Sequence, residues 1–290
     1  MDLEPRALRS FLAVADVLHF GRAAETMRVA QPALSQQIRR LERDLGVELF
    51  VRTSRSVALT PAGRVLRDRA RALLAQGEKD AEEVVRVARG EQGRLDVGFV
   101  SSALPLGPVR LVQQFRDEHP LVQVHLTEGW TAHLLERLLR GDLDLAIVRD
   151  PDPMDGVRLT PFHSERYVAA VPSGHRLAGR SSVRGPELAG DPFVFFPPGA
   201  GALATARNLA PVVAGGVVPE VVQEASSWTT LLHLVAAGIG VTVAPVSALL
   251  GAPDEVVTLE LEGDHEPSTL AWASRADDTR PVLRRFMDAV

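Results

Sequence analysis

The chain of 290 residues contains no cysteine, which excludes disulfides, thiolate metal sites and thiol redox switches. It also lacks any uninterrupted apolar run approaching the roughly 18 residues of a membrane-spanning helix. The first four residues include Asp2 and Glu4 and lead directly into a predicted helix, so we expect no signal peptide. These absences predict a cytoplasmic protein with no membrane partner.

Signatures of catalysis and of cofactor binding are absent as well. The sequence contains no G-x-S-x-G, H-E-x-x-H or phosphate-loop pattern. Its eight histidines never show a metal-ligand spacing such as H-x-x-x-H. Gly238 and Gly240 lack the third glycine of a dinucleotide motif and precede a predicted strand. We therefore predict no catalytic residue, no metal, no cofactor and no enzymatic activity.

Acidic and basic residues are unevenly distributed along the chain. The part ending at Arg89 holds 16 basic and 12 acidic residues and carries +4, whereas the remainder holds 16 basic and 25 acidic residues and carries −9, which gives the net charge of −5. DNA affinity depends on local phosphate contacts and not on whole-chain charge. An acidic chain is therefore compatible with a DNA-binding N-terminal part.

Residues 20–63 predict two short helices with a tight turn between them, followed by a hairpin and a long helix. In the second helix, predicted over residues 32–45, one face is apolar and comprises Leu34, Ile38, Leu41 and Leu45. The other face is polar and basic and comprises Ser35, Gln36, Arg39, Arg40 and Arg43. Such side chains can reach base edges and phosphates in a major groove.

This stretch resembles the winged helix-turn-helix of LysR-type transcriptional regulators. The matching residues are Ala23-Ala24, Gln31-Pro32-Ala33-Leu34-Ser35, Ile38, Leu41-Glu42, Leu45-Gly46, Leu49-Phe50, Arg52 and Leu59-Thr60-Pro61-Ala62-Gly63. The similarity extends over essentially the whole chain and is most specific in the first 63 residues. It implies an inverted-repeat promoter site in double-stranded DNA as a partner, with RNA polymerase as a further partner. The alternative is a helical hairpin that binds no DNA.

The predicted DNA contacts follow from this resemblance and from the polar face. They are Gln31, Pro32, Ser35, Gln36, Arg39, Arg52 and Arg55. Gln31, Ser35 and Gln36 would read bases, and the three arginines would hold phosphates or enter a minor groove. The two arginines of the hairpin are expected at or near its tip, where the alternative is a solvated loop.

Around this helix the sequence predicts a first helix over residues 5–18, a second helix capped by Gly21, a two-stranded wing over residues 49–60, and a long helix from Thr60–Pro61 to Arg89. The long helix carries a continuous apolar stripe that needs a partner. The resemblance implies that this linker helix joins two subunits in a homodimer and that effector domains join dimers into a homotetramer. The alternative is a helix packed against its own chain.

Beyond a predicted hinge at residues 90–93, strands alternate with helices, which predicts a parallel or mixed sheet with helices on both faces. Strands are expected at 94–100, 122–127, 143–148, 166–171, 192–196, 220–223, 240–244 and 269–274, and helices at 104–119, 131–140, 201–214, 227–237 and 279–289. The predicted fold is therefore an α+β multi-domain chain. It comprises a winged helix-turn-helix (1–60), a linker helix (61–89) and an effector-binding domain (90–290). The resemblance implies a periplasmic-binding-protein-like effector domain with subdomain I (94–163 and 267–290) and subdomain II (164–266).

Ligands of open α/β sheets bind beyond the carboxyl ends of strands, where helix N-termini offer free N–H groups. The candidate effector-binding residues lie at such points or match the family's cleft. They are Ser101, Ser102, Thr131, Pro198, Gly199, Ser226, Trp228 and Arg149. Ser102 and Thr131 are alternatively helix caps, Trp228 a partly buried structural residue, and Arg149 a partner of Asp150. The resemblance favours a small anionic effector, an aromatic or dicarboxylic acid. A solute-binding module without a regulatory role is the alternative function.

Overall fold

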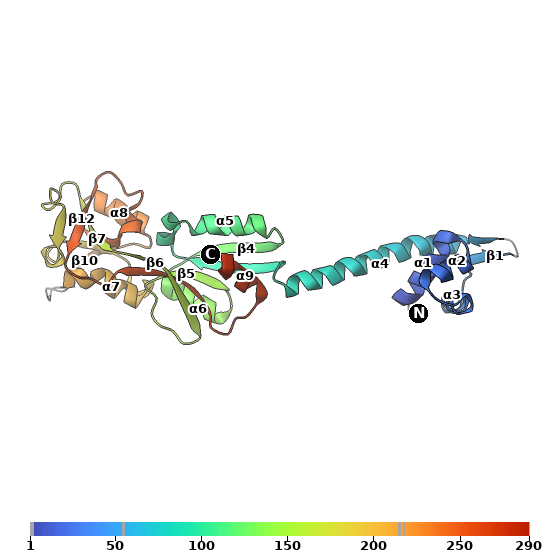
Figure 1. Cartoon of the computed structure of the whole chain (residues 1–290). Helices are drawn as coiled ribbons and strands as arrows, with labels where there is room; N and C mark the ends of the chain where they lie inside the picture. The colour runs from blue at the N-terminus through green and yellow to red at the C-terminus, as the bar shows by residue number, and fades with distance from the viewer. Residues whose placement is uncertain (1–2, 54–55, 214–215, 217, 290) are drawn as a thin grey trace. The chain divides into compact units, whose positions relative to one another are not determined.

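The computed structural model describes residues 3–53, 56–213, 216 and 218–289 (Figure 1). The chain divides into two compact units, Met1–Arg86 and Val87–Val290. The elements of the first unit are α1 (Pro5–Val17), α2 (Phe20–Met27), α3 (Gln31–Leu45), β1 (Phe50–Arg52), β2 (Val57–Leu59) and most of α4 (Pro61–Ala88). β1 and β2 form the predicted antiparallel wing.

The three short helices enclose a common apolar core. Phe11, Leu34 and Ile38 are completely buried, and Phe50 of the wing packs against Phe11 and Phe20. The apolar stripe predicted for α3 therefore faces this core, as its periodicity requires. Gly46 ends α3 in the left-handed conformation, with φ 69°, which glycine adopts at low cost.

The predicted cap of α2 is wrong. His19 occupies the N-cap position, and its Nδ1 accepts a hydrogen bond from the Arg22 N–H at 3.2 Å. Gly21 lies inside the first turn of the helix, beside the His19 ring. The helix is therefore capped by a histidine nitrogen, two residues before the predicted position.

α4 begins as predicted, because Thr60 Oγ1 accepts a hydrogen bond from the Gly63 N–H at 2.9 Å. Gly63 also lets the helix approach the start of the wing closely. A Cβ placed at this position would lie 2.1 Å from the Leu49 carbonyl oxygen. The wing is therefore fastened to the first turn of α4 by a contact that only glycine permits.

Gly63→Ala is expected to destabilise the first unit by about 1–3 kcal/mol, because the new methyl group would overlap the backbone of Leu49. Gly179→Ala in an exposed turn of the second unit is the control, since no described atom beyond Gly179 and its chain neighbours lies within 4 Å of its added Cβ. The control should change stability by less than about 0.5 kcal/mol. Thermal unfolding followed by circular dichroism measures both changes, and equal effects would contradict the proposed contact.

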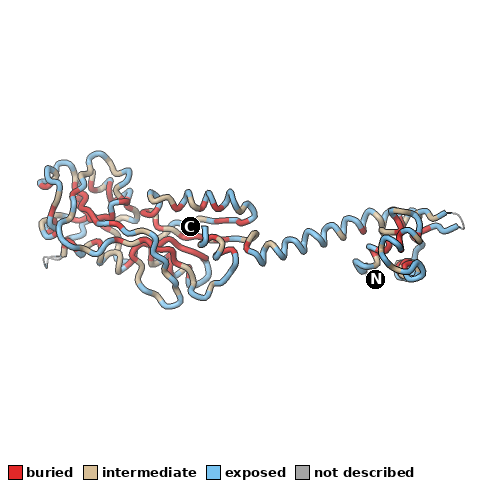
Figure 2. Tube along the Cα trace, in the orientation of Figure 1, coloured by how far each residue is buried: buried red, intermediate tan, exposed pale blue. Residues whose placement is uncertain are grey.

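The second unit contains two larger sheets, and each includes a strand that is almost entirely buried (Figure 2). The first sheet has the strand order β4-β3-β5-β13-β6. Its strands are β3 (Gly93–Phe99), β4 (Val122–Glu128), β5 (Leu145–Arg149), β6 (Val157–Glu165) and β13 (Ser268–Arg275). β3 runs parallel to β4 and β5, and β13 runs antiparallel to β5 and β6. The predicted return of the C-terminal strand to this sheet is therefore confirmed.

Helices cover both faces of the first sheet. α5 (Pro108–Glu118) and α6 (Thr131–Arg140) lie on opposite sides of it (Figure 1). α9 (Pro281–Ala289) packs beside α5, with the Phe115 and Phe286 rings 4.8 Å apart. The helix predicted over residues 104–119 is divided at Gly107, which has φ 91° and separates a 3-10 helix (Ser101–Leu106) from α5.

The second sheet has the strand order β11-β7-β12-β8. Its strands are β7 (Tyr167–Pro172), β8 (Ser182–Arg184), β11 (Thr242–Pro245) and β12 (Val256–Glu262). A parallel pair, β9 (Phe193–Phe195) with β10 (Val221–Glu224), adjoins β11 through a bridge from Phe193 to Val241. α7 (Ala202–Val213), α8 (Trp228–Ala236) and 3-10 helices at Gly185–Glu187, Pro198–Ala200 and Val246–Leu249 complete this half. β6, β8 and β12 were not predicted.

The segment predicted as a hinge is attached to α9. Gly90 has φ 68°, and a Cβ at this position would lie 2.5 Å from the backbone of Pro281. Arg285 Nη2 also donates a hydrogen bond to the Arg89 carbonyl oxygen at 2.9 Å. Bending at Gly90 itself would therefore break contacts of the second unit.

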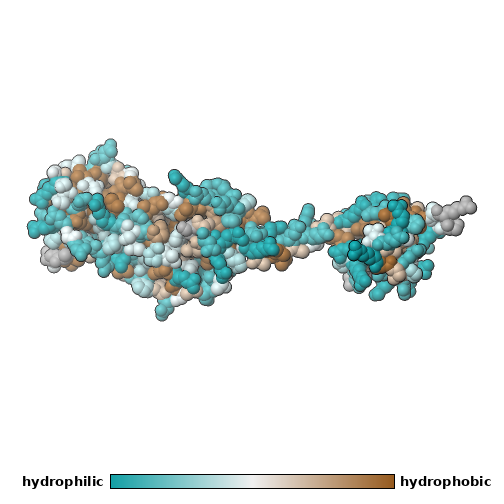
Figure 3. Space-filling view, in the orientation of Figure 1, coloured by the Kyte–Doolittle hydropathy of each residue, from teal (hydrophilic) through white to brown (hydrophobic). Residues whose placement is uncertain are grey.

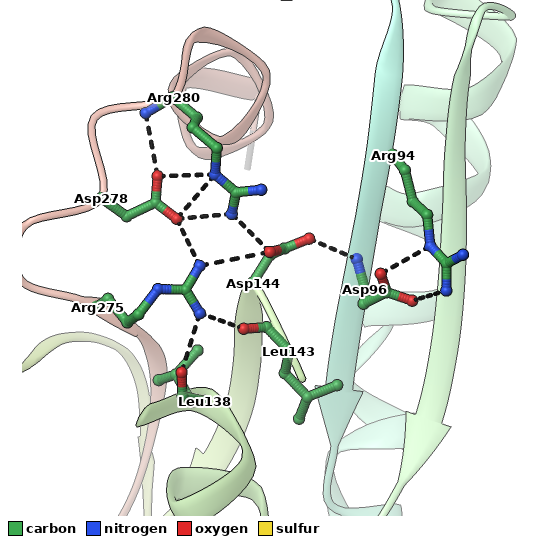
Figure 4. Close-up of polar contacts among 8 residues, drawn as sticks. All are labelled: Arg94, Asp96, Leu138, Leu143, Asp144, Arg275, Asp278 and Arg280. Atoms are coloured by element: carbon green, nitrogen blue, oxygen red, sulfur yellow. Dashed lines mark hydrogen bonds and ion pairs between the residues drawn. The ribbon is translucent and has the colours of Figure 1, made fainter. Parts of the chain in front are cut away.

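Beside this attachment, an ionic cluster fastens β3, β5 and the loop before α9 together (Figure 4). Asp144 accepts from Arg275 and Arg280 and from the Asp96 N–H. Burial alone would raise the pKa of Asp278, but its hydrogen bonds and charge contacts with Arg280 and Arg275 lower the pKa below its ordinary value. The cluster therefore holds these segments together at the end of the first sheet where β3 and β5 begin.

Candidate DNA-contacting face and effector cavity

The face of α3 opposite the core is open to solvent. Gln31, Pro32, Gln36 and Arg39 are exposed, and Ser35 is half-buried. Arg43 is exposed on the same face and lines a shared hollow with Gln36 and Arg39. The sequence placed Arg43 on this face, although it was not among the predicted DNA contacts. The arrangement offers amide, hydroxyl and guanidinium groups together, the types that read base edges and hold phosphates.

Glu42 holds the wing against α3. Its Oε1 accepts hydrogen bonds from the Leu49 and Phe50 N–H groups at 3.0 and 3.2 Å. Its Oε2 accepts from Arg52 Nη2 at 2.8 Å, and the Arg52 guanidinium carbon lies 4.6 Å from the centre of the Phe20 ring. Arg52 pairs with Val57 within the strands, and its guanidinium stabilises the domain internally. Arg55, the other predicted wing contact, lies outside the described residues.

A cavity of about 70 Å³ lies in the second unit between elements of the two sheets. The half of this unit that is built on the first sheet contributes the ends of β3 and β5, the 3-10 helix that follows β3 and the start of α6. The second half contributes β9, α7 and the start of α8. This is the predicted place for a ligand, beyond the carboxyl ends of parallel strands.

Six of the predicted effector residues line this cavity, namely Ser101, Ser102, Thr131, Arg149, Ser226 and Trp228. Pro198 and Gly199 are not among the described residues that line it. Their loop contributes the neighbouring Phe196, Ala200 and Gly201 instead. The sequence also missed three lining residues of α7, which are Ala204, Thr205 and Asn208. Helical periodicity alone does not say which face of α7 borders a cavity.

Aromatic side chains form the walls and connect the halves. Trp228 is 7% exposed, and its ring contacts the Phe196 ring edge-on at 4.9 Å. Trp130 lies at the N-cap of α6, and its Nε1 donates to the Ser226 carbonyl oxygen at 3.0 Å. The cavity therefore has apolar walls suited to a flat ligand, with polar groups at restricted points.

The polar centre of the cavity wall is Arg149, whose side chain is 5% exposed. Its Nε donates to Ser102 Oγ, and Nη1 donates to Glu165 and to Ser268 Oγ. Nη2 donates to the Ser102 carbonyl oxygen and to Ser247 Oγ. These acceptors use all five N–H donors of a guanidinium. The alternative given for Arg149, a pairing with Asp150, is wrong, because Glu165 is its carboxylate partner at 2.7 Å.

Burial alone would raise the pKa of Glu165, but hydrogen bonds from Ser247 and the charge of Arg149 lower it below the ordinary value of 4.5. A carboxylate with a lowered folded-state pKa stabilises the fold above its unfolded-state pKa and loses that contribution as pH falls through the folded-state value. Glu165→Gln should therefore flatten the decline in stability below about pH 4.5, measured by denaturant unfolding across pH 3–7. If stability declined in the same way at low pH in Glu165→Gln, this contribution of the Glu165 carboxylate to stability would be contradicted.

Asp150 adopts φ 44°, an uncommon conformation for a residue with a side chain. Its carboxylate accepts from Tyr167 Oη at 2.7 Å, from the Thr269 N–H at 2.7 Å and from Arg207 Nη1 at 3.1 Å. Burial and the nearby Asp150 charge raise the pKa of Tyr167, which keeps its hydroxyl protonated as the donor. Asp150 thus connects the first sheet to β7 and α7 of the second half.

The remaining polar groups at the cavity differ in their availability. Thr131 Oγ1 donates to the Arg149 carbonyl oxygen at 2.9 Å and accepts from its N–H at 3.1 Å, so it anchors α6 to β5 and does not cap the helix. Ser102 Oγ accepts from Arg149, and a hydroxyl also has one proton to donate. Together with the first N–H groups of α6, that hydroxyl can receive an acid group.

Comparisons with known proteins agree with both halves of this arrangement. Residues 5–64 match the family described as bacterial regulatory helix-turn-helix protein, lysR family, and residues 88–290 match the LysR substrate binding domain. The uncharacterized HTH-type transcriptional regulator YnfL of Escherichia coli is 37% identical over 289 residues, covering 99% of this chain and 97% of YnfL. The HTH-type transcriptional regulator AlsR of Bacillus subtilis is 33% identical over 285 residues, covering 98% and 94%.

The chain belongs to the LysR family of transcriptional regulators. It is a DNA-binding regulator with a winged helix-turn-helix and a substrate-binding effector domain, and the family is regulatory and not catalytic. The crystal structure of full-length CbnR complexed with its target DNA shares the fold, with a TM-score of 0.81 and 24% identity over 99% of this chain and 98% of that chain. Within the described ranges, no helix has the length and apolar character needed to cross a membrane.

Proposed function

We propose that the chain acts as a homodimer in the cytoplasm and places two copies of α3 in successive major grooves of an inverted-repeat promoter site. Gln31, Ser35 and Gln36 read bases, while Arg39 and Arg43 hold phosphates. Pro32 lies in the first turn of α3 and fixes the backbone there. The observation that carries this proposal is the exposed polar face of α3 on a buried apolar core.

The dimer contact is proposed along α4. From its middle to its C-terminal end, this helix leaves Leu73, Val84 and Val85 at 52%, 69% and 46% exposure. Hydrophobic and hydrophilic side chains both reach the visible surface of this helix (Figure 3). Apolar side chains along one helix stripe favour a helical partner of the same kind. Effector domains then join two dimers into a tetramer, and RNA polymerase is the partner of the assembled complex.

The regulatory ligand is proposed to be a small organic acid in the cavity. Its acid group lies between Ser101, Ser102 and the first N–H groups of α6, and its apolar body lies against the wall formed by Phe196 and Trp228. Dipoles at a helix N-terminus favour negative charge without a counter-ion. The cavity size and the aromatic walls favour an aromatic acid over a longer dicarboxylic acid.

Selection of bound sequences from random double-stranded DNA by the full chain tests the DNA proposal. The expected result is an enriched inverted repeat whose half-site centres are separated by about 10–10.5 base pairs or a multiple of this spacing. Enrichment of no motif, or of a single unrepeated half-site, would contradict dimeric recognition.

A thermal-shift panel of aromatic, dicarboxylic and amino acids on the full chain tests the effector proposal. A ligand at 100 times its Kd adds about 2.7 kcal/mol of stability to the unit that binds it. Stabilisation by an acid that disappears in Ser102→Ala supports the proposed site. Stabilisation that is equal in Ser102→Ala would place the ligand elsewhere.

A further inference from the structure

The charge balance of the cavity limits how many acid groups a ligand can carry. Arg149 is the one charged side chain among the described residues that line the cavity. Its positive charge is matched by Glu165 at 2.7 Å, and its five N–H groups already have acceptors. A second carboxylate would therefore enter a buried region without a free cation, which is unfavourable. The cavity suits an acid with a single carboxylate.

Asn208 introduces a different requirement. Its side chain lines the cavity on α7 and is 4% exposed. Its Nδ2 donates to the Ala204 carbonyl oxygen at 2.6 Å. Within the described part of the chain, its Oδ1 has no hydrogen-bond partner. A buried amide oxygen without a donor is uncommon in folded proteins and calls for a partner.

The Ala204 carbonyl oxygen fixes the orientation of the Asn208 amide. If the amide were reversed, Oδ1 would face the Ala204 carbonyl oxygen, and two acceptors would be in contact. The oxygen without a partner is therefore Oδ1 and not an exchanged nitrogen. It can accept a hydrogen bond from a hydroxyl or an amino group, but it has nothing to donate to a second acid group.

We propose that the effector is a small mono-acid that also carries a hydrogen-bond donor, a hydroxyl or an amino group, which binds to Asn208 Oδ1. This inference rests on the proposed effector role of the cavity. The acid group lies at the Ser102 side, and the donor lies at the α7 side. Asn208 is then a specificity-determining residue that distinguishes a hydroxylated or aminated acid from its unsubstituted parent.

The test uses matched ligand pairs on the full-length chain. Isothermal titration compares benzoate with 3-hydroxybenzoate, 4-hydroxybenzoate and 3-aminobenzoate. The best substituted acid is expected to bind about tenfold more tightly than benzoate, the effect of one hydrogen bond to a buried acceptor. Tighter binding of benzoate than of all three substituted acids would overturn the inference.

Asn208→Leu keeps a similar side-chain volume and removes the acceptor. It should abolish the tenfold preference, because the substituted acid would bind more weakly while the affinity for benzoate would stay unchanged. Asn208→Gln, which retains a neutral amide oxygen as acceptor, should keep the preference, and its thermal unfolding also checks that position 208 tolerates change. Thr205→Val on the same wall of the cavity is the matched control and should leave the preference intact.

The outcomes separate this inference from the proposed function. If Asn208→Leu retains the full preference, or if Thr205→Val abolishes it, the assignment of the donor to Asn208 is overturned while the effector cavity stands. If none of the four acids binds to the unmodified chain, but an acid without a donor group does, the inference fails alone. If no acid of any class binds, the proposed effector site fails with it.

Discussion

Glu165→Ala is expected to lower the free energy of unfolding of the effector domain by about 3–5 kcal/mol, the usual cost of removing one partner from a buried ion pair. Glu165 is 4% exposed in its side chain and accepts from Arg149, from Ser247 Oγ and from the Ser247 N–H. Its loss would leave the Arg149 charge buried without a counter-ion. Denaturant unfolding monitored by tryptophan fluorescence measures the effect, because Trp130, Trp228 and Trp272 all lie in this domain.

Glu260→Ala is the matched control, because Glu260 also pairs with an arginine, Arg166, but both side chains are more than half exposed. An exposed pair contributes about 0–1 kcal/mol. The double variant Arg149→Met with Glu165→Leu should recover much of the lost stability, since both charges are removed together. Equal effects of Glu165→Ala and Glu260→Ala would contradict the importance assigned to the buried pair.

The combined change Ser35→Ala and Gln36→Ala is expected to reduce affinity for the selected DNA site by at least tenfold, because each base contact contributes about 1–3 kcal/mol of discrimination. Both side chains lie on the open face of α3, away from the buried Leu34 and Ile38. Affinity for unrelated DNA should remain unchanged. Fluorescence anisotropy with both DNAs provides the measurement.

Arg39→Ala separates phosphate contacts from base readout. It should weaken binding to both DNAs and reduce the slope of log K against log salt by about 1. Arg110→Ala is the control, since Arg110 is exposed on α5 of the other unit. If Ser35 and Gln36 can be replaced without loss of site preference, α3 does not read the sequence as proposed.

Local sequence patterns were sufficient for elements with clear periodicity or clear end signals. α3 was predicted almost to the residue, because its apolar stripe is regular and Gly46 provides a left-handed end. α6 has the predicted bounds for the same reasons, with Gly141 at its C-cap. β6 was missed because most of its residues are exposed and Pro161 lies within it, a residue that weakens a strand prediction.

The ends of strands were sufficient to predict residues that line the cavity, whereas contacts that depend on tertiary partners were not predicted. Ser102 and Trp228 line the cavity as expected. No local signal, however, connects Arg149 with Glu165, because the pair forms only when β5 and β6 flank β13 in one sheet. Asn208 was missed because its role depends on which face of α7 meets the other half of the domain.

Footprinting of the full chain on its selected DNA, with and without the tightest acid from the titrations, tests the coupling of the two units most directly. We expect two protected half-sites in both conditions and a changed protection pattern at one of them when the acid is saturating, because a ligand can shift a conformational equilibrium. Identical footprints with and without the acid would contradict regulation through the cavity. No protected inverted repeat in either condition would contradict the proposed mode of DNA binding.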